Sequence, residues 1–250
     1  MIFMAPDVYV TKYMKSSGDI NPEILAKAEK FLITGYQREL TFMREDGSFS
    51  AFGERDDEGS LFLTAFVLRT FSEAKELIYI DENVLERAKN WIISKQSEEG
   101  YWEPIGFVHH KEMLGGVSGR VPLTAYVVSS LLEYGYRTES GISYLKKIYP
   151  TLDDSYSIAI VSYALSLAGS SSDEVIDKLI EASRGDENGL HWGYEFENPA
   201  ISIEATSYAA LALTNSGRFE DAKQAIDWIL SKRNSNGGFF STQDLSLIHI

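Results

Sequence analysis

One segment of the sequence, residues 105–116, combines the side chains best suited to chemistry at neutral pH. It holds the adjacent pair His109 and His110, and Glu112 follows two residues later. An imidazole titrates near neutral pH, so a histidine beside a carboxylate suits general-base or nucleophilic work. The structural alternative, which the residue types alone favour, is that one histidine packs on Trp102 while the other faces solvent.

Other reactive side chains point to ordinary structural roles. The chain has no cysteine, which excludes disulfides, thiolate metal sites and a cysteine nucleophile among these residues. None of the four histidines forms an H-E-x-x-H motif. The pair Asp153-Asp154 could bind Mg²⁺, but carboxylates are also favoured as caps at the N-terminus of a helix, which is the interpretation we prefer. Ser60, Ser118 and Ser129 lack a G-x-S-x-G context. We therefore expect no metal and no cofactor.

Composition describes a folded acidic protein of 250 residues, enough for one large domain or two small ones. Hydrophobic residues make up 44% and charged residues 24%, values typical of a globular chain. The net charge of −14 repels phosphate backbones and anionic lipid surfaces, which argues against nucleic-acid partners. The sequence has no run of 18 uncharged apolar residues, so we expect no membrane span.

Two kinds of helical segment alternate along the chain. The first kind is apolar on most sides, as expected of buried helices. It comprises residues 63–68, 123–128, 157–164 and 205–211. The second kind is amphipathic, with apolar residues three and four positions apart. It comprises residues 23–31, 84–93, 175–182 and 222–230. Buried inner helices that alternate with solvated outer helices predict an all-α fold, an α/α toroid or an open solenoid.

A glycine turn recurs after the outer helices, at Gly47, Gly100, Gly189 and Gly237. The spacing fits a repeat of about 48 residues, the size of a helix pair with its turns. Residues 96–102 have the Q-x-x-x-G-x-W form found in terpene cyclases, which share the toroid architecture with prenyltransferases. Strand signals are weak, because no tight Asn-Gly hairpin sits between alternating runs.

Several longer motifs resemble the thioester domain of the α2-macroglobulin/complement family, with the greatest similarity to insect-type thioester-containing proteins. They are residues 35–41, 45–53, 63–67 and 110–116, in the order and spacing of the family. The resemblance covers residues 1–244 and implies an α/α toroid. Leu61-Phe62 replaces the Thr-Trp often found in the family, a change that conserves bulk.

The resemblance also implies a chemistry. In that family a Gly-Cys-Gly-Glu-Gln motif forms an internal thioester, which acylates an amine or hydroxyl after proteolysis. This motif is absent here, and residues 1–7 resemble its continuation. We therefore expect a domain truncated at both ends, with residues 245–250 a non-native tail. Such a protein is not an enzyme, because each thioester is used once.

Residue roles follow from the same resemblance. His110 aligns with the histidine that attacks the thioester to form an acyl-imidazole, and Glu112 is a candidate for orienting its ring. His109 lies one residue away from this position and is expected to be structural or solvated.

The implied protein is extracellular and secreted, and acts in innate immunity or endopeptidase inhibition. Its expected partners are hydroxyl- or amine-bearing surfaces, proteases and the other domains of the same polypeptide. Two alternatives remain, an α/α-toroid enzyme of the terpene cyclase or prenyltransferase class and a non-covalent helical binding module.

Overall fold

The computed structural model describes residues 4–17, 22–108, 116–193 and 199–233. These residues form helices, short 3₁₀ turns and one small hairpin. The helices are α1 (Met4–Ser17), α2 (Pro22–Leu40), α3 (Leu61–Ala74), α4 (Glu82–Ser94), α5 (Arg120–Tyr134), α6 (Glu139–Ile148), α7 (Ser155–Leu167), α8 (Asp173–Glu181), α9 (Pro199–Asn215) and α10 (Phe219–Ser231). The 3₁₀ turns are η1 (Gly53–Arg55) and η3 (Tyr149–Thr151), and the strands are β1 (Arg184–Asp186) and β2 (Gly189–His191).

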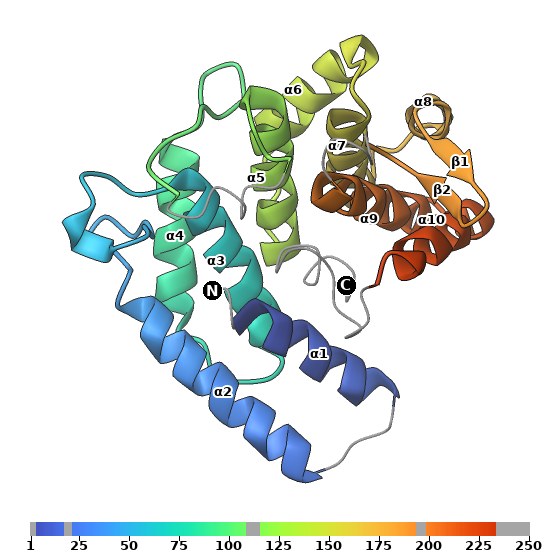
Figure 1. Cartoon of the computed structure of the whole chain (residues 1–250). Coiled ribbons are helices and arrows are strands. Elements are labelled where there is room, and N and C mark those ends of the chain that lie inside the picture. The colour runs from blue at the N-terminus through green and yellow to red at the C-terminus, as the bar shows by residue number, and fades with distance from the viewer. Residues whose placement is uncertain (1–3, 18–21, 109–115, 194–198, 234–250) are drawn as a thin grey trace.

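The odd-numbered helices form the inner layer of the fold. In the order α1, α3, α5, α7 and α9, each packs against the next, and each also packs on the even-numbered helix that follows it (Figure 1). The predicted alternation of inner and outer helices is therefore confirmed, and the fold is the α/α toroid class rather than a sheet structure.

Burial separates the two layers as the sequence predicts. Residues 122–131 of α5 form an unbroken buried run, because side chains on every face of this helix meet a neighbour. The outer helix α4 buries only Leu85, Ala88, Trp91 and Ile92, which lie on one face. Arg87 and Lys89 lie on its other faces. The spacing of three and four residues in the outer helices thus marks the single stripe that faces the inner layer.

A repeated hydrogen bond fixes the three described glycine turns, at Gly47, Gly100 and Gly189, to the inner helix that follows each of them. The backbone N–H of the buried aromatic residue after the turn donates to a threonine hydroxyl in that helix. The three pairs are Phe49 with Thr64 at 2.9 Å, Trp102 with Thr124 at 3.1 Å and Trp192 with Thr206 at 3.0 Å. This bond sets one register for α3, α5 and α9, in which the three threonines are equivalent positions.

Glycine in these turns is required by both backbone conformation and space. Gly100 has φ +96°, and a Cβ there would lie 2.3 Å from the carbonyl oxygen of Ser140 in α6. Gly135, at the end of α5, has the similar φ of +98° but no atom within 4 Å of a built Cβ. Substitution at Gly135 therefore measures the destabilisation caused by the left-handed backbone conformation alone. Substitution at Gly100 adds the steric clash with α6.

We expect Gly100→Ala to lower the free energy of unfolding by about 3 kcal/mol or more, because left-handed strain and a backbone clash add. Gly135→Ala should cost only about 1–2 kcal/mol, the price of the left-handed conformation. Urea denaturation followed by circular dichroism measures both. Equal losses in the two variants would contradict the close approach of this turn to α6.

The described residues include one small hairpin, where the sequence shows only weak strand signals. Strand β1 pairs antiparallel with β2, and Asp186 lies opposite Gly189 across the turn. The Asp186 carboxylate closes this turn by accepting the backbone N–H of Asn188 at 2.7 Å. Each strand has only three residues, too few to show the alternation by which strands are recognised in a sequence.

The carboxylates that begin two of the turns repeat one pattern. Asp46 Oδ1 accepts the backbone N–H of Ser48 at 3.0 Å, and Oδ2 accepts the indole N–H of Trp91 at 2.9 Å. Asp186 accepts the indole N–H of Trp228 at 3.1 Å in the same way. Burial opposes ionisation of Asp46, but these hydrogen bonds outweigh it and hold its pKa below the ordinary value.

A lowered pKa in the folded state means that ionised Asp46 stabilises the fold above its unfolded pKa, and that this contribution is lost as pH falls through the folded pKa. In Asp46→Asn the free energy of unfolding should therefore fall less steeply below about pH 4 than in the unchanged protein. The difference should be less than about 1 kcal/mol, because solvent screens the carboxylate. Thermal unfolding across pH checks this. Asp57→Asn, at an exposed aspartate, removes the same charge and is the control. The same change in pH dependence in this control would show that the hydrogen bonds of Asp46 are not its cause.

Candidate functional site

The residues predicted to carry chemistry, His110 and Glu112, lie outside the described residues, as does His109. Their predicted roles therefore stay predictions. The structure describes the chain on both sides, up to Val108 and again from Gly116. What it establishes is where these two flanks are held and what surrounds them.

The flanks lie at the end of the toroid where the inner helices begin. Pairs of contacts give the directions of the inner helices. Phe62 of α3 stacks on Tyr126 of α5 at 5.0 Å, and seven residues further along both helices Arg69 pairs with Glu133. Tyr156 of α7 donates to Glu204 of α9, and further along both helices Tyr163 packs on Tyr208. Tyr9 and Lys12 of α1 lie against Arg69 and Glu73 of α3 in the same order. Gly116, four residues before α5, lies against Tyr156 at the start of α7. The inner helices therefore run in the same direction from one end of the toroid.

The start of α1 belongs to this same end. Its first described residues, Met4 and Ala5, are buried, and the side chain of Met4 packs beside Gly35 of α2. Met4 and Ala5 belong to the segment that resembles the continuation of the thioester motif, of which residues 1–3 lie outside the described residues.

The flank that leads into the segment is tied to the start of α3. The backbone N–H of Leu61 donates to the carbonyl of Ile105 at 3.0 Å. Gly106 has φ +78°, and a Cβ there would lie 2.3 Å from the carbonyl oxygen of Gly59. This part of the chain therefore runs in close contact with the residues that precede α3.

The flank that leaves the segment is tied to α7 and α9. The backbone N–H of Gly116 donates to Oε2 of Glu204 at 2.8 Å. The other carboxylate oxygen of Glu204 accepts the hydroxyl of Tyr156 at 2.8 Å. The same connection is braced further out by an ion pair between Arg120 and Glu103. Both ends of the predicted reactive segment are thus fixed by residues outside it.

An apolar cavity of about 310 Å³ lies between the two flanks. Its lining includes Phe62, Ile105, Val108, Val117 and Leu123. The cavity lies beside the starts of α3 and α5, and its lining is mostly apolar, so any group held there meets a surface of low polarity. Such surroundings favour an uncharged ligand or an apolar side chain over a free ion.

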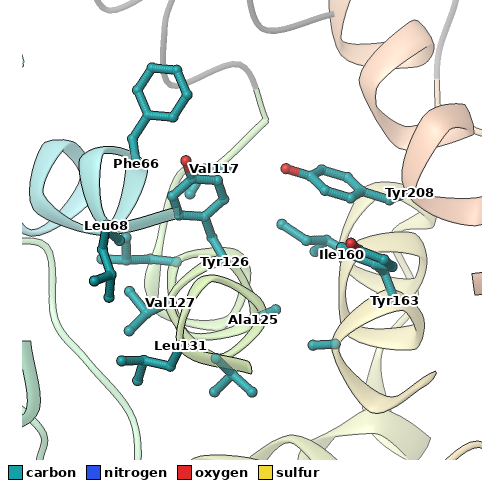
Figure 2. Packing of buried hydrophobic residues seen from close by; sticks show 14 of the residues in the cluster. Phe66, Leu68, Val117, Ala125, Tyr126, Val127, Leu131, Ile160, Tyr163 and Tyr208 are labelled. Carbon is teal, nitrogen blue, oxygen red and sulfur yellow. The ribbon is translucent and has the colours of Figure 1, made fainter. Parts of the chain in front are cut away.

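The interior of the toroid holds a buried polar cluster that sequence reasoning missed. Nε of Arg69 lies 2.5 Å from Oε2 of Glu133, and the hydroxyl of Tyr163 donates to Oε1 of Glu133 at 2.5 Å. Figure 2 shows Tyr126 and Tyr208 on facing sides of the same interior space, with Tyr163 next to Tyr208. The sequence signal was present, since Arg69 and Glu133 are charges within apolar helices.

Burial shifts the pKa values of the groups in this cluster. Burial raises the pKa of Glu133, and the guanidinium of Arg69 opposes that rise. Burial lowers the pKa of Arg69, but Glu133 and the surrounding tyrosines together outweigh burial and raise this pKa well above its ordinary value. Burial also raises the pKa of Tyr9, which faces Arg69 from α1, to about 12. The ion pair of Arg69 and Glu133, given by their 2.5 Å contact, thus lies in a strongly desolvated part of the fold.

The remaining candidates have structural roles. Asp154 caps α7 by accepting the backbone N–H of Ser157 at 2.8 Å, as the helix-start interpretation predicts. Ser60 caps α3, and the hydroxyl of Ser129 donates to carbonyl groups within its own helix. Within the described ranges no cluster of three or more histidine, aspartate or glutamate side chains is arranged to hold a metal ion.

A related observation concerns membranes. In the part of the chain that the structure describes, no helix is both long and apolar enough to cross a bilayer.

Comparison with known proteins agrees with the architecture and with the motifs. The A-macroglobulin TED domain family matches residues 1–247. Ovostatin of Gallus gallus is 31% identical over 270 aligned positions, which include 98% of this chain. The chain spans 18% of the length of ovostatin.

Proposed function

Because this chain belongs to the A-macroglobulin TED domain family, we propose that it is the thioester domain of a secreted protein that couples covalently to its targets. The observation that carries the proposal is the family match over residues 1–247, on a fold of alternating inner and outer helices. The thioester cysteine must come from outside these residues, since the chain has none. We place the Gly-Cys-Gly-Glu-Gln motif directly ahead of Met1.

In the proposed reaction, His110 is the first nucleophile. One imidazole nitrogen attacks the thioester carbonyl, the carbon–sulfur bond breaks, and the cysteine leaves as a thiolate. The oxygen of a target hydroxyl then attacks the acyl-imidazole, the imidazole leaves, and the thiolate takes the hydroxyl proton. Glu112 orients the His110 ring in this scheme. The apolar cavity beside the segment favours the scheme, because low polarity protects an acyl intermediate from water.

The proposed partners are surfaces that bear hydroxyl or amine groups, proteases, and the other domains of the same polypeptide. The proposed setting is extracellular, in innate immunity or in the inhibition of endopeptidases. A thioester consumed in one acyl transfer makes the protein a single-use reagent rather than a turnover enzyme.

The alternative of a cyclase or prenyltransferase gains no support from the interior of the toroid. Those enzymes need a deep apolar cavity on the axis of the barrel. Within the described residues that region holds the ion pair of Arg69 and Glu133 and the ring of Tyr163.

The sequence upstream of Met1 in the full transcript is the simplest test of the proposed thioester. A Gly-Cys-Gly-Glu-Gln motif that ends within two residues of Met1 supports a thioester domain. Any other sequence at that place would sink the proposed chemistry, whatever the fold.

A further inference from the structure

We propose that Glu204 is a positioning residue for the acyl-transfer segment, an assignment that rests on the proposed function of His110. Glu204 lies in the second turn of α9 and is only 1% exposed. A carboxylate buried to this degree costs several kcal/mol unless hydrogen bonds satisfy it. Its presence at this depth therefore needs a reason.

The internal repeat shows that the fold does not require a carboxylate there. The threonines that anchor the glycine turns define equivalent positions in α3, α5 and α9. The residues two places before these threonines are Phe62, Pro122 and Glu204. Two inner helices thus have an apolar residue at the position where α9 has Glu204. The fold therefore does not need a carboxylate at this position of the repeat.

The hydrogen bonds of the Glu204 carboxylate show which parts of the chain it connects. Oε2 accepts the backbone N–H of Gly116 at 2.8 Å, and Oε1 accepts the hydroxyl of Tyr156 at 2.8 Å. The two contacts join the connection before α5 to α7 and α9, across the end of the toroid. A hydrogen bond to a charged acceptor is stronger and more directional than one between neutral groups.

Gly116 is also held sterically, and it is the first described residue after the predicted reactive segment. A Cβ at this position would lie 2.2 Å from the ring of Tyr156, so the backbone sits directly against that ring. Tyr156 is itself fixed through its hydroxyl by Glu204. Carboxylate, phenol ring and backbone amide therefore set the point at which the chain leaves the segment that carries His110 and Glu112.

This geometry gives Glu204 a defined effect on chemistry. A displacement of about 1 Å at a reacting group costs up to 100-fold in rate. Acylation of a hydroxyl passes through His110 in the proposed scheme, whereas an amine attacks the thioester directly. Loss of the anchor should therefore impair transfer to hydroxyls far more than transfer to amines.

The first measurement uses the 250-residue chain itself. Glu204→Gln keeps the size of the side chain but replaces the carboxylate, and Glu181→Gln on the exposed surface of α8 is the matched control. We expect faster hydrogen exchange at the Gly116 amide in Glu204→Gln and no change in Glu181→Gln. Unchanged exchange at Gly116 in both variants would overturn the anchoring contact.

The second measurement uses the full-length protein that carries the thioester, with labelled glycerol and labelled methylamine as acceptors. Glu204→Gln should lower glycerol incorporation about 10-fold and leave methylamine incorporation within about twofold. Equal losses for both acceptors, or no loss for glycerol, would overturn the positioning role. Tyr156→Phe, which removes the hydrogen bond to Oε1 and leaves the one from Gly116, should show a smaller shift in the same direction.

A parallel His110→Asn variant distinguishes failure of the proposed role of His110 from failure of the proposed role of Glu204. If it abolishes glycerol uptake while Glu204→Gln does not, only the positioning role of Glu204 is wrong. If it leaves glycerol uptake intact, the role of His110 fails, and the role of Glu204 fails with it.

Discussion

Replacing Arg69 by methionine should lower the free energy of unfolding by about 3–5 kcal/mol, the cost of removing one partner from a buried ion pair. The side chains of Arg69 and Glu133 are 4% and 10% exposed, so water cannot replace the missing guanidinium. Methionine keeps most of the length of arginine, and the loss therefore reports on charge rather than on a cavity. Chemical denaturation of the two proteins measures it.

The pH dependence of this variant provides a second readout. Without Arg69, the largest effect that opposes the burial-induced rise in the pKa of Glu133 is gone, and only the weaker effects of the Tyr163 hydroxyl and Lys12 remain. A carboxyl whose folded pKa is raised stabilises the fold in its protonated form, and that stability is lost as pH rises through the folded pKa. Arg69→Met should therefore regain stability, relative to the unchanged protein, as pH falls from about 7 towards 5.

The double variant Arg69→Met with Glu133→Leu is the control. It removes both charges, so it should recover much of the loss, as replacement of whole buried ion pairs by apolar residues often does. The hydroxyl of Tyr163 loses its acceptor in this variant, and recovery is accordingly incomplete. A single-variant loss below about 1 kcal/mol would show that the pair is not desolvated as the structure indicates.

Substitution of His110 by asparagine should redirect acyl transfer in the full-length protein that carries the thioester. We expect glycerol incorporation to fall about 100-fold, in the range that positioned catalytic groups contribute. Methylamine incorporation should persist, because an amine is nucleophilic enough to attack the thioester without an acyl-imidazole. Parallel labelling with the two acceptors gives the ratio directly.

His109→Asn is the matched control for this experiment, since it changes the same side chain one residue away. It should leave both acceptors nearly unchanged. Undiminished glycerol uptake in His110→Asn would remove His110 from the mechanism. Loss of glycerol uptake only in His109→Asn would show that the family alignment of this segment is displaced by one residue.

The sequence was informative about the fold because burial has a strong signature in helices. Residues 123–128 are apolar on all faces and proved to belong to a buried inner helix, while the pattern of residues 84–93 correctly marked an outer one. The turn at Gly100 was recognisable because only glycine combines a positive φ with contact to a neighbouring carbonyl group.

Features that depend on contacts between distant residues were not predictable in the same way. The hairpin at residues 184–191 forms from strands too short to show alternation. Glu204 and Gly116 are far apart in sequence, and only the circular arrangement of inner helices brings them together. A charge inside an apolar helix, as at Arg69, signals a buried partner but does not say which residue supplies it.

The most direct test of the proposed thioester is the reaction of the native full-length protein with labelled methylamine. The amine should attack the thioester carbonyl and break the carbon–sulfur bond, which leaves the label on the glutamine side chain and frees the cysteine thiol. We predict that peptide mapping by mass spectrometry finds the label in the peptide directly ahead of Met1, with release of a thiol in equal amount. Intact protein that takes up no methylamine and releases no thiol would contradict the assignment of this chain to a working thioester domain.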